Sequence, residues 1–363
     1  MQLKPECLVI NTVTRERKKM VERFLQTMRI SIASAGIFCT VGMGIVSAST
    51  GGGLNDPEPV SGHPVSLEGI TPADVLARVQ LLRDTLELIR FEMGKPMAAQ
   101  SDSIVTNVHP HEIYFQALTL FLKSDRLALE LTGSTGIPPE PVSLSALAPL
   151  QIWKMVNAAY HRVLAIKEEL ALKDHVAERP KDSSTSLTET GRAIVETNRQ
   201  LNLLLERRFS PSDVSQQVLL ASQYAKRLLS RFPQATVPPT SAPLERGKEP
   251  ADVFLRLAEC YATLEKIAHQ SSVPVLHLDL PAAVKVVEQS GPLEPSDVYD
   301  IATLLVSDLA YLHAQLNTDN APKPIPYPGR TFPSHVYQQA TVLLHQLEAL
   351  ESLVAINPTW LSR

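Results

Sequence analysis

Residues 71–89 read TPADVLARVQLLRDTLELI, a stretch that contains both the start and the body of a helix. Proline is favoured at the first helical position, because its missing N–H has no partner to lose there and its fixed φ suits the helix. Thr71 can cap a first-turn amide, and Asp74 lies at the positive end of the helix dipole. The stretch therefore predicts an amphipathic helix from Pro72. Its apolar residues recur every three or four positions, at Val75, Val79, Leu82, Leu86 and Ile89.

The same start recurs as a Pro-x-x-Val/Ile motif, which is a proline followed three residues later by Val or Ile. Each copy opens about twenty residues with helical apolar spacing. Successive motif prolines are 38, 39, 62, 39, 45 and 38 residues apart, and the 62-residue step contains an eighth helical pattern without the proline, over residues 187–208. Eight helices are predicted. The seven motifs begin at Pro72, Pro110, Pro149, Pro211, Pro250, Pro295 and Pro333.

The residues around the motif prolines repeat the capping chemistry. Ser210 can act as Thr71 does, because its hydroxyl precedes Pro211. Acidic side chains in the first turn are favoured by the helix dipole. They recur at Glu112, Asp213, Asp252 and Asp297.

The second half of the chain aligns with the first at offsets of 139, 140, 146 and 146 residues for helices one to four. Similar residues coincide at Phe121 and Tyr261, and at Trp153 and Tyr299. Nearly constant offsets across four helices favour an internal duplication. We therefore predict an all-α fold of two tandem four-helix units, residues 71–208 and 210–357. The alternative is a continuous α-solenoid with a repeat of about 38 residues, which the irregular 45-residue step and the missing fourth proline disfavour.

Long proline-rich straps are expected between the helices, in segments such as TGIPPEPVS and NAPKPIPYPGRTF. At about fifteen residues each they are long for bundle connections. An extended strap of that length spans about 50 Å, whereas a helix of 22 residues is about 33 Å long. The straps can therefore return the chain to its starting end, which permits parallel as well as antiparallel neighbours.

Residues 1–48 are interpreted as an export signal. No charged residue occurs between Arg29 and Asp56, and the apolar stretch ends in Val46, Ser47 and Ala48, which suits cleavage before Ser49. Two alternatives are a mis-called start, with the true one at Met28, and an uncleaved membrane anchor. Residues 49–70 are rich in Gly, Ser and Pro and are predicted to form a flexible leader. The protein is expected to be periplasmic or secreted, with anchoring in the inner membrane as the other outcome.

The composition and charge of the chain favour a folded protein that does not bind nucleic acid. Hydrophobic residues make up 44% of the chain, enough for a core. Residues 1–48 carry seven basic and three acidic groups, so the remainder has a net charge of −4 − 4 = −8. An acidic body argues against nucleic acid as a partner, because neutralising phosphates supplies most of that affinity. Cys260 is the only thiol after residue 48, so stability is expected to come from packing.

Aromatic residues follow the Val or Ile of the motif in five of its seven copies. One interpretation is a ligand pocket at the end of each bundle. The other is a layer of the hydrophobic core near the helix starts, since aromatics at helical spacing usually pack. The five candidate ligand-binding residues are Tyr114, Trp153, Phe254, Tyr299 and Tyr337.

Other reactive residues form no recognisable catalytic or metal site in the sequence. His109 and His111 could supply two metal ligands, but spacing places no third or fourth ligand beside them. Cys260 lies within a helical pattern, where no helix N-terminus would activate it, and is interpreted as a small buried residue. No catalytic residue, metal or cofactor is therefore predicted.

These observations favour a non-enzymatic exported helical protein. We expect it to bind a protein or peptide partner in the cell envelope, or to play a structural role there, using its helical surface or its proline straps. The partner is not expected to be nucleic acid, and membrane contact is expected only through an N-terminal anchor. The alternative is a small-molecule-binding or sensory helical bundle that uses the aromatic pockets.

Overall fold

The computed structural model describes residues 69–96, 105–144, 147–206, 208–232, 240–278, 293–316, 321–323 and 325–362. The predicted signal peptide, and all but the last two residues of the predicted leader, lie outside these ranges. Residues 66–363 form one compact unit, to which all the described helices belong.

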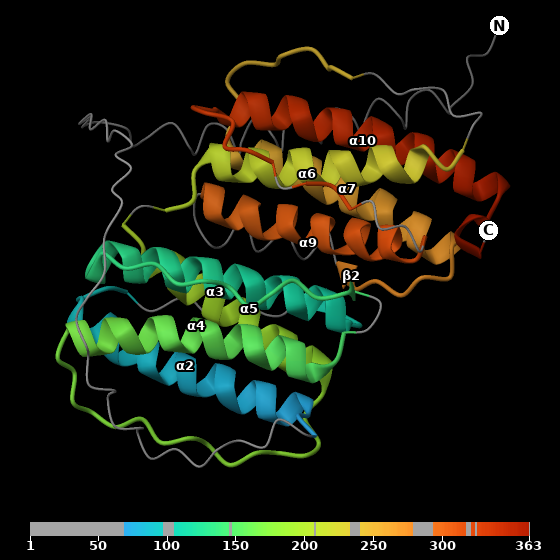
Figure 1. The fold of residues 1–363 in the computed structure, drawn as a ribbon. Helices are drawn as coiled ribbons and strands as arrows, with labels where there is room; N and C mark the ends of the chain where they lie inside the picture. The colour runs from blue at the N-terminus through green and yellow to red at the C-terminus, as the bar shows by residue number, and fades with distance from the viewer. Residues whose placement is uncertain are drawn as a thin grey trace, which may run out of the picture. The chain divides into compact units, whose positions relative to one another are not determined.

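The prediction of an all-α fold is confirmed (Figure 1). Seven helices begin at the motif prolines, and the eighth begins at Leu187. Within the described ranges the helices are α2 (Pro72–Glu92), α3 (Pro110–Thr132), α4 (Pro149–Glu169), α5 (Leu187–Leu204), α6 (Pro211–Leu229), α7 (Pro250–Gln270), α9 (Pro295–Ala314) and α10 (Pro333–Ile356). None of them is long and apolar enough to span a membrane.

Helix α5 ends earlier than the predicted limit of residue 208. Leu205 adopts an extended conformation, with φ −64° and ψ 131°. Helix α5 ends here because α6 begins at Pro211, so the chain must leave α5 and reach Ser210, the N-cap of α6, within a few residues.

The third residue of every described helix caps that helix. Its side chain accepts a hydrogen bond from the backbone N–H of the N-cap residue, as in the 2.8 Å bond from Thr71 to Asp74 and the 2.7 Å bond from Ser210 to Asp213. The predicted Ser210 cap is confirmed, since its hydroxyl also accepts from the Asp213 N–H at 3.4 Å. The Thr71 hydroxyl donates to the Asp74 carboxylate at 2.6 Å, as the Ser210 hydroxyl does to that of Asp213.

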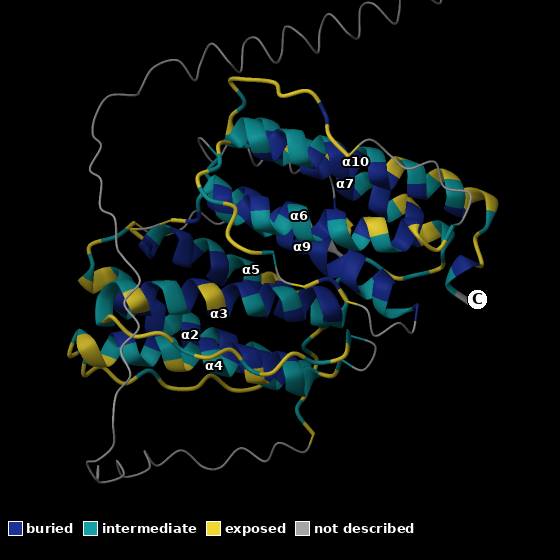
Figure 2. Cartoon of the chain, turned by 45° about the horizontal axis from the view of Figure 1, so that its top comes forward, coloured by how far each residue is buried: buried dark blue, intermediate teal, exposed yellow. Residues whose placement is uncertain are grey.

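The helices pack in two sets of four with the same pattern of neighbours. In the first set, α2 and α3 each contact both α4 and α5, and in the second, α6 and α7 each contact both α9 and α10 (Figure 1). The sides that face each other are buried (Figure 2). The predicted apolar face of α2 is confirmed: Val75, Val79, Leu82, Leu86 and Ile89 are all at most 1% exposed.

The four helices of each set run in the same direction. In the first set, Thr190 at the start of α5 donates to the carbonyl of Pro72 at the start of α2, at 3.4 Å. Arg78 in the first half of α2 lies over Trp153 in the first half of α4, and Arg162 in the second half of α4 pairs with Asp125 in the second half of α3. In the second set, the motif residues of all four helices line one small apolar cavity. The long straps therefore return the chain, as their lengths permit. The lining residues are Pro211, Val214, Pro250, Val253, Pro295, Val298, Pro333 and Val336.

The two sets meet through α3 and α9, which run in opposite directions. His111 at the start of α3 contacts Asp308 in the second half of α9, at 3.0 Å. Lys123, further along α3, pairs with Asp300 near the start of α9, at 2.7 Å. The connection from α5 to α6, residues 205–210, is short. Helix α6 therefore runs in the opposite direction to α5, whereas the long straps within each set bring the chain back to the end at which the previous helix began.

A short antiparallel pairing joins two straps. Strand β1 (Val105–Thr106) precedes α3, and β2 (His277–Leu278) follows α7. Val105 pairs with Leu278, and Thr106 pairs with His277. The pairing fixes the strap after α7 beside the start of α3.

Candidate functional site

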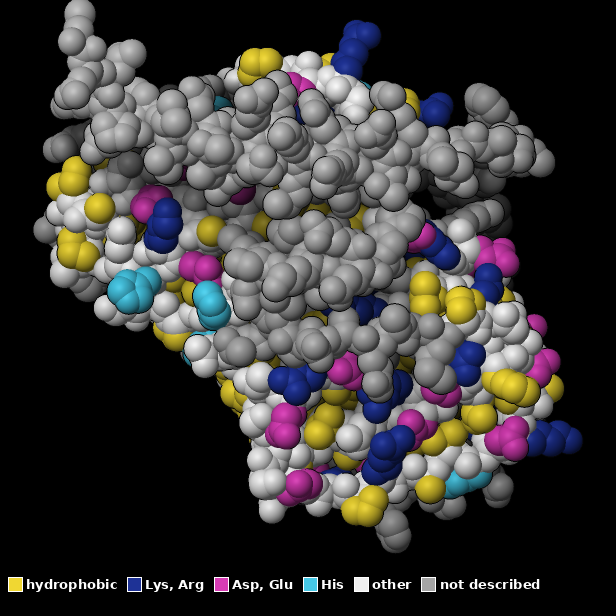
Figure 3. Space-filling view, turned by 180° about the vertical axis from the view of Figure 1, so that it is seen from behind, with side chains coloured by type: hydrophobic (Ala, Val, Ile, Leu, Met, Phe, Trp, Pro, Cys, Tyr) yellow, Lys and Arg dark blue, Asp and Glu magenta, His cyan; other side chains and the backbone are white. Residues whose placement is uncertain are grey.

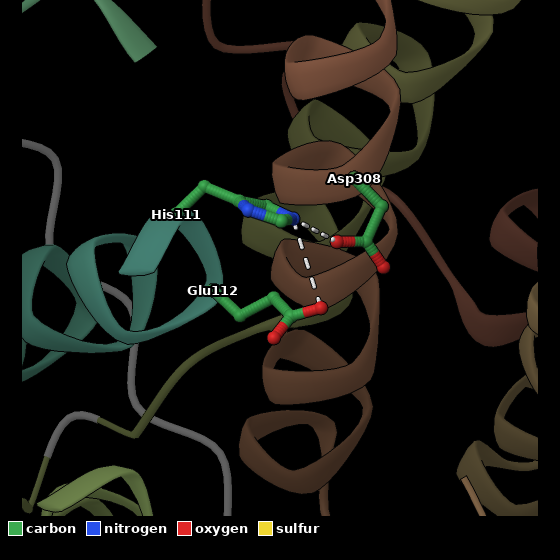
Figure 4. Close-up of side chains that lie close together, drawn as sticks. All are labelled: His111, Glu112 and Asp308. Carbon is green, nitrogen blue, oxygen red and sulfur yellow. Dashed lines mark hydrogen bonds and ion pairs between the residues drawn. The ribbon is translucent and has the colours of Figure 1, made fainter. Parts of the chain in front are cut away.

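Three buried polar side chains converge where the start of α3 meets α9. His111 and Glu112 come from the first turn of α3, and Asp308 comes from α9 (Figure 4). They are 2%, 1% and 0% exposed, so the site is closed to solvent. Each offers one metal-ligating atom, and these atoms all lie within 4.8 Å of one another. We call these three residues the His111 cluster.

Asp308 is held through both of its carboxylate oxygens. Oδ1 lies 3.0 Å from Nε2 of His111, and Oδ2 accepts a 2.7 Å hydrogen bond from the hydroxyl of Tyr261 on α7. The neighbouring Ser307 hydroxyl contacts Oδ1 at 3.3 Å. A carboxylate that is fully buried within a helix is costly to bury unless it is hydrogen-bonded in this way.

Glu112 is both the cap of α3 and a member of the cluster. Its Oε2 accepts from the His109 N–H at 2.6 Å, and its Oε1 accepts from the Leu276 N–H at 2.5 Å. The same Oε1 lies 3.6 Å from Nε2 of His111. Because Leu276 belongs to the strap after α7, one carboxyl group connects the two sets of helices.

Burial strongly raises the pKa of Glu112. Desolvation first, and then the negative charge of Asp308, raise the pKa of Glu112 to about 10, although the two backbone N–H bonds oppose this. Glu112 is therefore protonated and uncharged at neutral pH. Burial likewise raises the pKa of Tyr261 well above its ordinary value, and the charge of Asp308 adds to the effect. Tyr261 is thus a neutral hydrogen-bond donor to Asp308.

Aromatic stacking orients the His111 ring. The ring of Tyr311, one turn after Asp308, lies 4.0 Å from it at an interplanar angle of 5°. The His109 ring stacks more distantly, at 6.1 Å. Such contacts fix the direction in which Nε2 points. The cluster is therefore a pre-organised group of one imidazole and two carboxyl groups, the donor types that bind divalent transition metals.

The five predicted ligand-binding aromatics lie on five different helices. Tyr114, Trp153, Tyr299 and Tyr337 are 4–9% exposed, and Phe254 is partly buried against the core. The cavity at the helix starts of the second set is lined by proline and valine, so none of the five contributes to it. Ligand binding by these residues stays a prediction.

Three of the five aromatic rings contact a side chain from a neighbouring helix or from the connection between the sets. The Arg78 guanidinium lies 5.3 Å from the centre of the Trp153 ring, and that of Arg256 lies 5.0 Å from the Tyr337 ring. Tyr299 packs at 4.3 Å against Phe209, in the connection between the two sets. These contacts are those expected of a core layer near the helix starts.

Sequence reasoning singled out His111 but missed its partners. Asp308 lies 197 residues away, and no spacing rule connects the two. Glu112 is adjacent to His111, but its role as a helix cap gave no reason to expect a second contact. A usable signal was the single acid among mostly apolar residues in IATLLVSDLAYLHA, residues 301–314, because an unpaired charge there would be costly to bury.

Cys260 is fully buried, as interpreted from the sequence. Its Sγ lies 3.5 Å from the carbonyl oxygen of Ala340. Burial raises the pKa of the thiol, which disfavours the reactive thiolate. Cys260 therefore packs as a small apolar residue.

No protein family model matches this chain, and no curated protein and no solved structure is significantly similar to it.

Proposed function

We propose that this chain is a non-enzymatic exported protein of the cell envelope that binds another protein or peptide. The observation that carries the proposal is the strap before α10, residues 325–332, which we call the aromatic strap. It presents Tyr327 and Phe332 to solvent, at 63% and 49% exposure, along an anchored backbone. Exposed aromatic side chains on a fixed backbone are typical anchors of protein interfaces.

Three hydrogen bonds hold the aromatic strap against α6. Gln216 donates to the carbonyl of Ile325 at 2.9 Å, and Ser212 donates to that of Gly329 at 2.7 Å. The Ser212 hydroxyl in turn accepts from the Thr331 N–H at 3.0 Å. Little conformational entropy is left for the strap to lose when it binds, which favours affinity.

Its sequence also favours an extended shape. Prolines occur at every second position from 322 to 328, and the residue before a proline is restricted to extended conformations. Proline-rich extended segments are bound by aromatic-lined grooves in many recognition domains. The partner that suits this strap therefore has an apolar groove.

Charge adds a second requirement for the partner. Residues 321–332 include Lys323 and Arg330 and no acidic residue. The Arg330 guanidinium lies 5.2 Å from the centre of the Phe332 ring, so charge and aromatic surface are presented together. We expect the groove of the partner to be acidic at its rim, which would steer the encounter.

The remaining surface and the buried residues are consistent with this role. On the face seen in Figure 3, the described Lys and Arg side chains lie among Asp and Glu side chains, which gives no basic stripe for nucleic acid. The most reactive groups, Cys260 and the His111 cluster, are enclosed in the interior. Both observations support binding through the straps over catalysis.

We also propose that the two sets of helices are the four-helix units 71–208 and 210–357, related by duplication. The matching pattern of helix neighbours supports this. So do Asp125 and Glu265, which are 265 − 125 = 140 residues apart. Each accepts a backbone N–H from the strap that follows its helix: Gly136 bonds to Asp125 at 2.6 Å, and Leu278 bonds to Glu265 at 3.0 Å.

Site-specific photocrosslinking in the native host tests the binding role. A photoreactive phenylalanine analogue at position 327 should trap one defined envelope protein. The matched control is position 91 on α2, where Phe91 is 80% exposed but lies outside the aromatic strap. Identical products at both positions, or no product at 327, would count against the proposal.

Affinity measurements with the trapped partner make the test quantitative. Tyr327→Ala should weaken binding about tenfold or more, as loss of an interface anchor does. Phe91→Ala should leave the affinity unchanged. A synthetic peptide of residues 321–332 should compete with the full chain for the partner, and failure to compete would mean that the strap is not what the partner binds.

A further inference from the structure

We propose that the His111 cluster binds one divalent transition-metal ion, with Zn²⁺ as the best-matched probe, between α3 and α9. The ligands would be Nε2 of His111, one carboxylate oxygen of Glu112 and one of Asp308. This site is independent of the aromatic strap and of the proposed binding role. Its function would be structural, because all three side chains are at most 2% exposed and no substrate could reach the ion.

The spacing of the donor atoms suits coordination. Nε2 of His111 lies 3.0 Å from Oδ1 of Asp308 and 3.6 Å from Oε1 of Glu112. Two donors at these separations would subtend about 90° and about 120° at an ion about 2.1 Å from each, values that bracket the tetrahedral angle. A small adjustment of side chains would therefore be enough for all three to bind one ion, with water as a fourth ligand.

Other groups hydrogen-bond to or stack on the three proposed ligands, and metal sites commonly use such contacts to orient their ligands. Tyr261 holds the outer oxygen of Asp308, and the N–H groups of His109 and Leu276 hold the Glu112 carboxylate. Tyr311 supports the His111 ring from one face. Outer partners of this kind fix ligand geometry and typically contribute about tenfold to a hundredfold in metal affinity.

Charge favours a cation at this position. Two carboxyl groups lie in a part of the interior where no Lys or Arg of the described residues pairs with either of them. The nearest ion pair along the same helices, Lys123 with Asp300, is a separate contact. A divalent ion that displaces the proton of Glu112 would neutralise both carboxylates at once and would connect the two sets of helices directly.

The choice of ion depends on the ligand set. One imidazole nitrogen and two carboxylate oxygens suit Zn²⁺ and similar borderline ions, whereas Ca²⁺ and Mg²⁺ prefer oxygen ligands alone. Three protein ligands in a closed site also favour four-coordinate Zn²⁺ over ions that need six ligands.

Zinc titration of the metal-stripped full chain tests the site. Wild-type protein should take up one equivalent of Zn²⁺, measured by calorimetry and elemental analysis, and its Tm should rise on binding. Co²⁺ in place of Zn²⁺ should give the visible absorption bands of a four-coordinate nitrogen and oxygen site. Wild-type protein that binds no Zn²⁺, or whose Tm does not change, would overturn the proposal.

Matched variants locate the ion. Asp308→Asn keeps the size of the side chain and an acceptor for Tyr261, and should lower zinc affinity at least tenfold. His109→Gln changes the histidine beside the cluster and should retain the wild-type affinity. If Asp308→Asn fails to fold, His111→Gln takes its place, and the cobalt spectrum of wild-type protein remains decisive. Equal losses in His109→Gln and the cluster variant would place the ion elsewhere and overturn the proposal.

Discussion

Corresponding positions in the two sets of helices have very different environments. Under the proposed duplication, Phe121 and Arg162 of the first set correspond to Tyr261 and Asp308 of the second. Arg162 forms an ion pair with Asp125 at 2.8 Å, and both side chains retain some exposure. Asp308 is fully buried and bonded to Tyr261 and His111.

The difference arises from what covers each helix. In the second set, α3 of the first set packs against α9 and encloses Asp308. The outer side of α4, which carries Arg162, retains exposed and half-buried residues (Figure 2). The comparison shows that the same arrangement of helices can hold a partly exposed ion pair or a fully buried polar cluster, depending on whether further helices pack over it.

Removing Asp308 should have the largest effect. In metal-free protein, Asp308→Ala leaves His111, Glu112 and Tyr261 buried without their common partner, so we expect a loss of about 3–5 kcal/mol in the free energy of unfolding. The corresponding Arg162→Ala should cost only about 1 kcal/mol, because its ion pair is partly solvated. Urea unfolding checks both. Similar losses for the two variants would mean that burial does not distinguish the positions.

Ion pairs between the sets should matter more than those within a set. Lys123 is fully buried and pairs with Asp300, whereas Arg83 and Glu196 in the first set are 33% and 40% exposed in their side chains. Lys123→Met should lower the free energy of unfolding by about 3 kcal/mol, since Asp300 loses its partner. Arg83→Met should cost less than about 1 kcal/mol. Thermal unfolding of both variants compares them, and a smaller effect for Lys123→Met would contradict the expectation.

Tyr261→Phe places in the second set the residue type found at Phe121 in the first. The loss of one hydrogen bond to a buried carboxylate should cost about 1.5–3 kcal/mol. Tyr299→Phe is the control, because the hydroxyl of Tyr299 has a longer contact, 3.3 Å from Gln217, and should cost less. Chemical unfolding curves measure both. An unchanged midpoint for Tyr261→Phe would show that Asp308 does not need the phenol.

The smallest effect is expected at acidic pH, at the start of α2. Burial tends to raise the pKa of Asp74, but hydrogen bonds from Lys181 and Thr71 outweigh it and lower the pKa from 3.8 to about 2. The folded state thus binds the proton more weakly than the unfolded state, so this stabilisation is complete above pH 3.8 and is lost as the pH falls to about 2.

The contribution should be about 1 kcal/mol or less, because Lys181 is 47% exposed in its side chain. Unfolding measured across this pH range in wild-type protein and in Asp74→Asn should show a shallower pH dependence in the variant. Parallel curves would show that Asp74 does not contribute.

Much of the secondary structure was predictable because helix starts are local. The motif proline, the capping residue before it and the side chain two positions after it act within four residues, and all seven motif helices begin where the motif places them. The end of α5 was less predictable, because Leu205 leaves the helix to reach the start of α6, which is a condition set by the neighbouring helix.

The direction of the helices and the candidate site depended on contacts between distant residues. Strap length permitted parallel and antiparallel neighbours alike, and only packing selects between them. In the sequence, nothing distinguishes His111 and Asp308 from other helical residues. They meet because α3 of the first set packs against α9 of the second set. Capping chemistry and apolar spacing are short-range and can be read along the chain, whereas burial of a charge depends on which helix covers it.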